Sequence, residues 1–250
     1  MFRREGPARE PRKNIQLAAY LAATAGFVNS GGFVLIGSFT SHVTGTVGRF
    51  ARDVAEGEAA ASLSAASLVL AFFLGAFVAS LVLESRQPSE VASRYGLALG
   101  IEAGLLGCFV FIAGLSRASH PRILDAQAAL LCGAMGMQNS LVTRLSGAVV
   151  RTTHLTGVVT DLAIEAARAY RRYRSKLAGQ ARSSLPPATL AGHRVYLLLA
   201  IVLSFTLGAT AGAVLTLRAS RWAMCLPVAT TLLASVYAFF QASRAHAARD

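Results

Sequence analysis

The chain has 250 residues, of which 54% are apolar and only 14% are charged. An average soluble domain is roughly 45–50% apolar and about 25% charged. This composition excludes a disordered tail, a disulfide-rich scaffold and an ordinary soluble enzyme, and it indicates a surface that contacts lipid. The formal net charge of +12 is carried by short segments between long uncharged runs, which favours a membrane protein over one that binds nucleic acid.

The basic segment 1–14 precedes an apolar run that is too long for the hydrophobic region of a signal peptide. We therefore expect residues 1–14 to form a cytoplasmic tail. The cysteines Cys108, Cys132 and Cys225 lie far apart in apolar runs, and no Cys/His cluster has the spacing of a metal site. From these features we expect neither a metal nor another cofactor.

Six apolar runs meet or approach the roughly 20 residues that cross a bilayer core of about 30 Å as a helix. In chain order they are Ile15–Ile36, Ala59–Leu83, Tyr95–Ser116, Ala126–Thr143, Val195–Leu217 and Trp222–Ser243. Only the third run contains a charged residue, Glu102. The sequence thus predicts an all-α polytopic membrane protein with six transmembrane helices.

Lys and Arg are distributed unevenly between the segments that connect these runs. With the N-terminus in the cytoplasm, 18 of them lie in inner segments and six in outer segments. Because cytoplasmic loops are enriched in Lys and Arg, this bias predicts that both the N-terminal tail and the C-terminal tail 244–250 are cytoplasmic.

The two halves of the chain share a pattern of polar residues. Asn29-Ser30 is followed by the pattern HxTG at positions 42–45, and Asn139-Ser140 is followed by HxTG at positions 154–157. The two Asn-Ser pairs are separated along the chain by almost the same interval as the two HxTG patterns. This self-similarity predicts an internal repeat.

A later landmark shows where the second half is longer. Leu74-Gly75-Ala76 matches Leu207-Gly208-Ala209 at a larger interval than the earlier landmarks, and a basic insertion at 168–188 accounts for the increase. We expect the first repeat at 15–116 and the second at 122–243. Each would hold three spans, so the second would enter the membrane from the opposite side, as in the inverted repeats of many secondary transporters.

Both repeats have a polar break after their first helix. Irregular backbone at membrane depth is stable only inside protein or beside water, so we expect both breaks to face the bundle interior. The residues predicted to bind a solute between the halves are Asn29, Ser30, Thr44, Gly45, Asn139, Thr153, Thr156 and Gly157. Alternatively, these polar groups connect the helices by hydrogen bonds worth roughly 0.6–2 kcal/mol each.

Glu102 is the one acidic residue within a predicted span. An intramembrane acid is costly and suggests a function, so Glu102 is a candidate coupling residue that carries a proton; alternatively, it forms a hydrogen bond in its neutral form. His42 and His154 have no neighbouring Cys, Asp or Glu ligands, so we expect each to orient its loop and not to bind a metal.

Two further patterns concern packing and the membrane surface. Residues Leu155–Arg174 have helical amphipathic spacing and end in basic residues suited to anionic headgroups. Gly100-xxx-Gly104 and Gly208-xxx-Gly212 place small residues on one helix face, which allows close packing inside one bundle or in a homo-oligomer.

The segments GFVNSGGF, SHVTGTVG, MGMQNSLVTR and VRTTHLTGVVTDL resemble the YoaK-like family of bacterial inner-membrane proteins of unknown function. The resemblance covers nearly the whole chain after residue 14 and is most specific over Met135–Asp161. Such proteins usually have Asp where this chain has Asn29, and Asn where it has Thr46. The resemblance implies a permease-like protein of the bacterial inner membrane and supplies no substrate.

We therefore expect a small-solute permease or transporter whose partners are the lipid bilayer and an unidentified solute, with no role for nucleic acid. The alternative is a membrane scaffold or assembly partner that acts through the basic segment Arg168–Arg182. An intramembrane enzyme is disfavoured because the sequence contains neither HExxH nor GxSxG.

Overall fold

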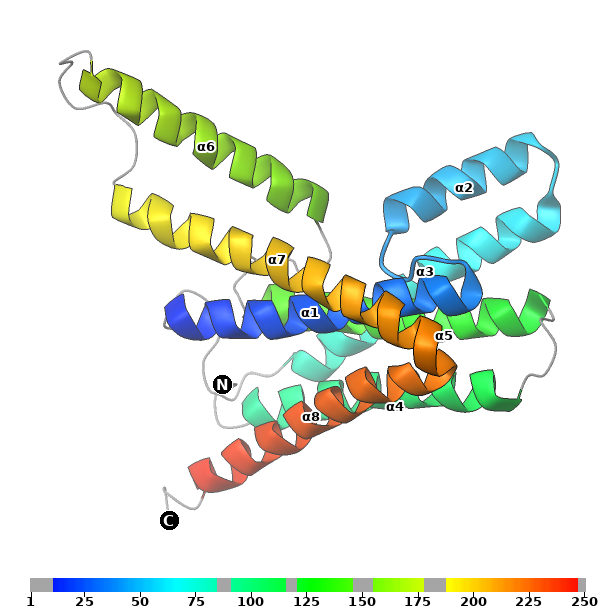
Figure 1. Cartoon of the computed structure of the whole chain (residues 1–250). Helices are drawn as coiled ribbons and strands as arrows, with labels where there is room; N and C mark the ends of the chain where they lie inside the picture. Colours follow the sequence, from blue (N-terminus) through cyan, green and yellow to red (C-terminus); the bar gives the residue numbers. More distant parts are fainter. Residues whose placement is uncertain (1–10, 85–90, 116–120, 146–154, 178–187, 247–250) are drawn as a thin grey trace.

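A computed structural model describes residues 11–84, 91–115, 121–145, 155–177 and 188–246, which form helices and short connections (Figure 1). In chain order the elements are α1 (Pro11–Ile36), α2 (Val43–Ala55), α3 (Ala59–Leu83), α4 (Val91–Leu115), α5 (Pro121–Leu145), α6 (Leu155–Leu177), α7 (Ala188–Ala219), the 3-10 helix η3 (Ser220–Met224) and α8 (Cys225–His246). The prediction of an all-α protein is confirmed for the described part of the chain.

Several of these helices are long and apolar enough to cross a membrane. Within the described residues, four candidate segments meet that criterion: Ile15–Ile36, Ala59–Leu83, Val91–Gly114 and Val195–Arg244, the last of which covers both α7 and α8. Large apolar side chains are exposed along α3, α7 and α8, and include Phe73, Leu203 and Leu233. Contiguous exposed apolar surface of this kind indicates contact with lipid, so the protein is an integral membrane protein.

The predicted span Ala126–Thr143 lies in α5, which is not among those four segments. Its sequence contains polar residues such as Gln127, Gln138 and Asn139. However, every residue from 131 to 138 is buried, because α5 packs against α1, α3 and α4. A helix covered by protein needs less hydrophobicity than one that contacts lipid.

The helix boundaries follow the predictions closely. The predicted span Ala59–Leu83 coincides with α3, and the amphipathic helix predicted from Leu155 is α6, which continues to Leu177. The last predicted span differs, because Trp222 lies in η3 and α8 begins only at Cys225. The turn from α7 into η3 has Ser220 at a φ of 52°.

Two glycines shape the connections around α2. Gly37 follows α1 with a φ of 68°, and Gly57 follows α2 with a φ of 76°. Both conformations are left-handed, which glycine adopts without the steric cost of a Cβ atom. The chain therefore leaves the end of α1, forms α2 and turns directly into α3, against which α2 packs.

The surface helix α2 has one buried acid. Asp53 is buried, and its carboxylate accepts two hydrogen bonds from the guanidinium of Arg52, at 2.6 and 3.0 Å. This contact raises the pKa of Arg52 above its usual value. Val47, Phe50 and Val54 are exposed on α2. Because they are separated by three and four residues, they form one apolar face.

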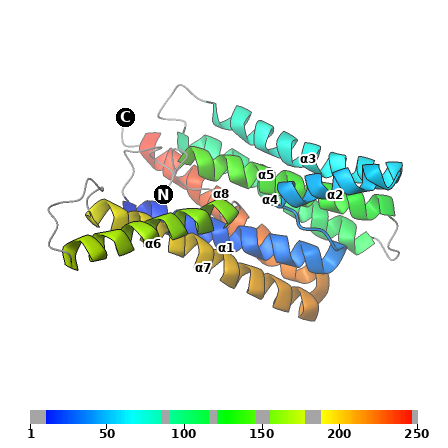
Figure 2. The ribbon, with the colours of Figure 1, turned by 90° about the horizontal axis from the view of Figure 1, so that it is seen from above.

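The bundle is built from three main helix pairs: α1 packs on α7, α3 on α5, and α4 on α8. In Figure 1, α1 begins and α8 ends at the same end of the bundle. Figure 2 shows α6 alongside α7 and α2 alongside α3, both at the periphery. The amphipathic helices thus lie outside the central bundle.

Small residues allow two of these pairs to approach closely. A Cβ atom on Gly208 would overlap the carbonyl oxygen of Ala23, and one on Gly136 would overlap the carbonyl oxygen of Phe72. The predicted contact face of Gly208 and Gly212 is therefore present between α7 and α1. By contrast, a Cβ atom on Gly104 would have no atom of the described residues within 4 Å, so only Gly100 of its pair contacts another helix.

Candidate functional site

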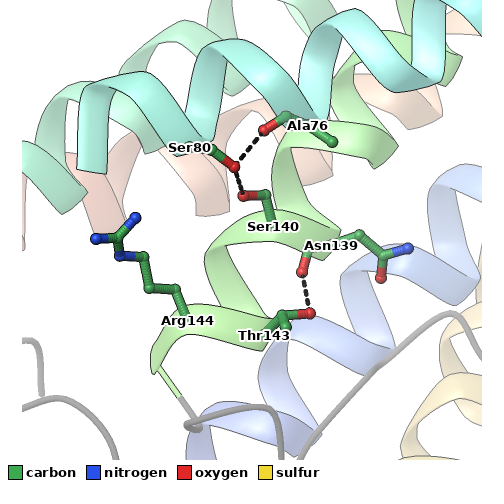
Figure 3. A pocket seen from close by; sticks show the side chains of 6 residues that line it. All are labelled: Ala76, Ser80, Asn139, Ser140, Thr143 and Arg144. Atoms are coloured by element: carbon green, nitrogen blue, oxygen red, sulfur yellow. Dashed lines mark hydrogen bonds between the residues drawn. The ribbon is translucent and has the colours of Figure 1, made fainter. Parts of the chain in front are cut away.

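A groove of about 540 Å³ with several polar residues in its lining lies between α3 and α5, near the end of each helix (Figure 3). It is lined by Ala76 and Ser80 of α3 and by Asn139, Ser140, Thr143 and Arg144 of α5. The α5 residues share one face because they are separated by about one helical turn. Sites for small molecules usually have volumes of roughly 300–1,000 Å³, so the groove is large enough for a small solute.

Hydrogen bonds order the groove's hydroxyl groups. The Ser80 hydroxyl donates to the carbonyl oxygen of Ala76 at 2.8 Å, and the Ser80 and Ser140 hydroxyl oxygens are 2.8 Å apart. Since Ser80 has a single proton, Ser140 is the donor between the two serines. Thr143 donates to the backbone carbonyl of Asn139 at 2.7 Å. In Figure 3 the side-chain amide of Asn139 points away from the contact between the serines.

An ion pair crosses the groove's outer end. Arg144 Nη1 of α5 lies 2.9 Å from Glu84 Oε2, which follows α3. The Glu84 side chain is 76% exposed and that of Arg144 is 31% exposed. Arg94 donates from Nη1 to the Glu84 backbone carbonyl at 2.8 Å. This bond fixes the end of α3 and thereby places the Glu84 side chain within reach of Arg144.

The corresponding polar residue of the first half, Asn29, has a clear structural role. Its side-chain oxygen accepts hydrogen bonds from the Thr40 backbone N–H at 3.0 Å, the Ser41 backbone N–H at 3.2 Å and the Ser41 hydroxyl at 3.1 Å. Asn29 is buried within α1. It therefore holds the segment that connects α1 to α2 against the bundle, and an Asp at this position would offer the same acceptor.

A second, smaller hollow of about 190 Å³ adjoins that segment. Its lining includes Phe39, His42, Gly45 and Arg49. The His42 ring covers Gly45 so closely that a Cβ atom there would overlap it, and Phe39 stacks on Phe33 with ring centroids 4.3 Å apart. This arrangement agrees with the expectation that His42 orients its loop.

Glu102 lies at the middle of the apolar segment Val91–Gly114 and is fully buried. Neither of its carboxyl oxygens has a hydrogen-bond partner among the described residues. The Tyr20 hydroxyl of α1 lies within electrostatic range of Glu102 and beside Thr231 of α8. These two hydroxyl groups are also buried without a partner in the described structure.

The structure brings only some of the predicted site residues together. Asn139 lines the groove, whereas Asn29 is engaged with the connection before α2, and Ser30 is half-buried on α1. Thr44 and Thr156 are exposed in the first turns of α2 and α6, next to the half-buried Gly45 and Gly157. The predicted residue Thr153, like His154, lies outside the described residues. No group of three or more His, Cys, Asp or Glu residues in the described ranges could hold a metal.

Sequence reasoning missed three residues that line the groove, Ser80, Thr143 and Arg144, and also Glu84, which pairs with Arg144 just outside it. Thr143 and Arg144 could have been found, since they lie one turn after Asn139 and Ser140 on the same helix. Ser80 and Glu84 carried no such signal, because their relation to α5 depends on how α3 packs.

Comparison with known proteins gives the family and no activity. Residues 17–237 match the family model described as "Protein of unknown function (DUF1275)", and the chain therefore belongs to this family. The YoaK-like proteins are part of it, so the resemblance noted in the sequence is confirmed. No curated protein and no solved structure matches the chain.

Proposed function

We propose that this protein is a permease that moves a small solute across the bacterial inner membrane by alternating access between two inverted halves. The halves are α1–α4 and α5–α8. The helices α1, α3, α4, α5, α7 and α8 cross the membrane, and both termini are cytoplasmic. The proposal needs a lipid bilayer and a solute as partners, and it includes neither catalysis nor nucleic acid.

Reciprocal helix pairing is the observation that carries this proposal. α1 of the first half packs on α7 of the second, and α5 of the second packs on α3 of the first. The contacts also correspond: Gly26 meets Phe205, and Gly136 meets Phe72. Gly26 and Gly136 are separated along the chain by the same number of residues as the two Asn-Ser pairs. Phe72 and Phe205 are separated by the same number of residues as the two Leu-Gly-Ala matches. Inverted repeats that exchange helices are expected to produce such matched contacts.

The groove fits a permease because both halves build it. Ser80 comes from the first half, and Asn139 and Ser140 come from the second. A relative movement of the halves would change the groove's shape and access. A groove that both halves share is one of the features that alternating access between repeats uses.

Glu102 supplies the coupling group of this mechanism. Glu102 has no cation or hydrogen-bond donor beside it among the described residues, and such a carboxylate is strongly disfavoured within a membrane span, so we propose that it carries a proton in this conformer. The Tyr20 hydroxyl lies within electrostatic range of Glu102 and also has no hydrogen-bond partner in the described structure. Movement of α8 against α4 would expose the carboxyl group and release the proton.

The test is a solute screen with purified protein reconstituted in vesicles. Wild-type vesicles are expected to accumulate at least one solute when a proton gradient is imposed. Asn139→Leu should abolish uptake by replacing a polar side chain of the groove with an apolar one, and Glu102→Gln should remove the dependence on the gradient while the purified protein stays folded. Uptake equal to that of protein-free vesicles for every solute would contradict the proposal.

A scaffold is the second candidate, and the exposed face of α6 favours it. Tyr170, Tyr173 and Leu177 are exposed on this helix, together with Arg171 and Arg174. Such a face could bind an acidic partner. Replacing both tyrosines and both arginines by serine would abolish a scaffold's function but leave the uptake of a permease intact.

A further inference from the structure

We propose that the groove between α3 and α5 binds solutes that carry an anionic group of the carboxylate class, and that this group replaces Glu84 on Arg144. This inference rests on the proposed permease function and specifies its substrate class. It follows from the groove's charge, its hydrogen-bonding groups and the position of Glu84.

The charge of the groove favours an anion. Arg144 is the only charged residue among those that line the groove in the described structure. A guanidinium group presents a fixed fork of N–H donors that matches a carboxylate in two-point contact. The remaining polar groups, on Asn139, Ser140 and Thr143, can hydrogen-bond other parts of a solute.

The contact with Glu84 shows which kind of group Arg144 binds. It lies just outside the groove lining and directs a carboxylate oxygen to 2.9 Å from Arg144. Its side chain is 76% exposed, and exposed ion pairs of this kind are weak. A solute carboxylate can take the place of Glu84 at this contact, because it offers Arg144 the same chemical group.

Displacement would also open the groove. In the ion pair, Glu84 and Arg144 join the end of α3 to the end of α5, which belong to different halves of the chain. An anion on Arg144 would release Glu84 and remove one of the contacts that join the two ends. Solute binding would thereby weaken the connection between the halves at this end of the bundle.

The experiment measures binding by calorimetry with the full chain in detergent at neutral pH. The probes are short carboxylates, each paired with its own amide: acetate with acetamide, benzoate with benzamide, and succinate with succinamide. Wild-type protein is expected to bind at least one carboxylate at least tenfold more tightly than its amide.

Two variants should change this affinity in opposite directions. Glu84→Gln removes the internal competitor and should tighten carboxylate binding about two- to fivefold, the range that corresponds to the strength of an exposed ion pair. Arg144→Gln should weaken it at least tenfold, whereas Arg144→Lys should retain part of it. If the ion pair were purely structural, both Gln variants would lose the same contact, and their carboxylate affinities would not change in opposite directions.

The inference is overturned if Glu84→Gln and Arg144→Gln shift the affinity in the same direction, or if no carboxylate binds more tightly than its amide. Uptake of a neutral solute by the wild-type protein, with no carboxylate bound, would refute the anionic substrate class and leave the permease standing. If the wild-type protein binds none of the carboxylates and takes up no solute, both the anionic substrate class and the permease function are refuted.

Discussion

Asn29 and Asn139 occupy matching positions in the sequence, but their oxygen atoms have different surroundings. The Asn29 side-chain oxygen accepts three hydrogen bonds from residues 40 and 41. The Asn139 backbone carbonyl accepts a bond from Thr143, and its side chain lines the groove. Residue identity alone therefore does not distinguish an amide that holds a connecting segment from one that lines a groove.

Replacing Asn29 tests its structural role. Asn29→Ala would leave buried donors of the connection before α2 without an acceptor, and we expect a loss of about 2–3 kcal/mol in the free energy of unfolding. Asn29→Asp keeps the acceptor oxygen and should retain most of the stability. The measurement is reversible unfolding of the purified protein in mixed micelles. Equal stability of Asn29→Ala and the wild type would show that these hydrogen bonds contribute nothing.

At the scale of the elements, close backbone contact determines which helices pair. α3 and α5 meet where Gly75 faces Gly133 and Gly136 faces Phe72. The contacts between residues 72 and 136 and between 80 and 140 occur in the same order along both helices, so the two helices run parallel. The same small-residue contact joins α1 to α7. Without a hydrophobic driving force inside the bilayer, such packing stabilises helix pairs.

Two alanine substitutions should therefore have opposite effects on the stability of the protein. Gly136→Ala would place a methyl group against the Phe72 carbonyl, and we expect it to destabilise the protein by about 1–3 kcal/mol. Gly104→Ala faces open space in the described structure and should stabilise its helix by roughly 0.5–1 kcal/mol. Thermal unfolding in one detergent compares them. Similar shifts of the unfolding temperature in both variants would mean that the close approach of α3 and α5 does not contribute to stability.

At the scale of the whole molecule, the matched contacts of α1 with α7 and of α3 with α5 make the fold an intertwined pair of halves. Neither half can form its main contacts alone, because the principal partner of each of these helices lies in the other half. The groove and the Glu84–Arg144 ion pair both depend on this exchange, since each combines helices from both halves.

The proposed topology predicts a pattern of chemical access. In a variant without its native cysteines, Glu58→Cys and Arg218→Cys should react with a membrane-impermeant maleimide in intact cells. Glu84→Cys and Tyr173→Cys should react only after the membrane is permeabilised, because they lie at the opposite end of the bundle. Labelling of Glu58→Cys and Tyr173→Cys from the same side would contradict the inverted arrangement.

Much of the fold is readable from local sequence patterns. The apolar run Ala59–Leu83 is α3 because a helix is the conformation that satisfies its backbone within a bilayer, and the periodicity after residue 155 predicted α6. The polar breaks directed attention to Asn139, but they also singled out Thr44 and Thr156, which are exposed on α2 and α6. A spacing pattern specifies neither the depth of a residue in the bundle nor the hydrogen bonds that it makes.

The sequence by itself determined the all-helical class, the membrane location and the family, because hydrophobic run length and motif composition are local properties. The tertiary structure alone decided that Glu84 meets Arg144, that Ser80 meets Ser140, and that Glu102 is fully buried. These contacts join residues that lie 60 or more positions apart along the chain. They exist only because small residues let particular helix pairs approach each other. No single segment of the sequence determines which helices pair.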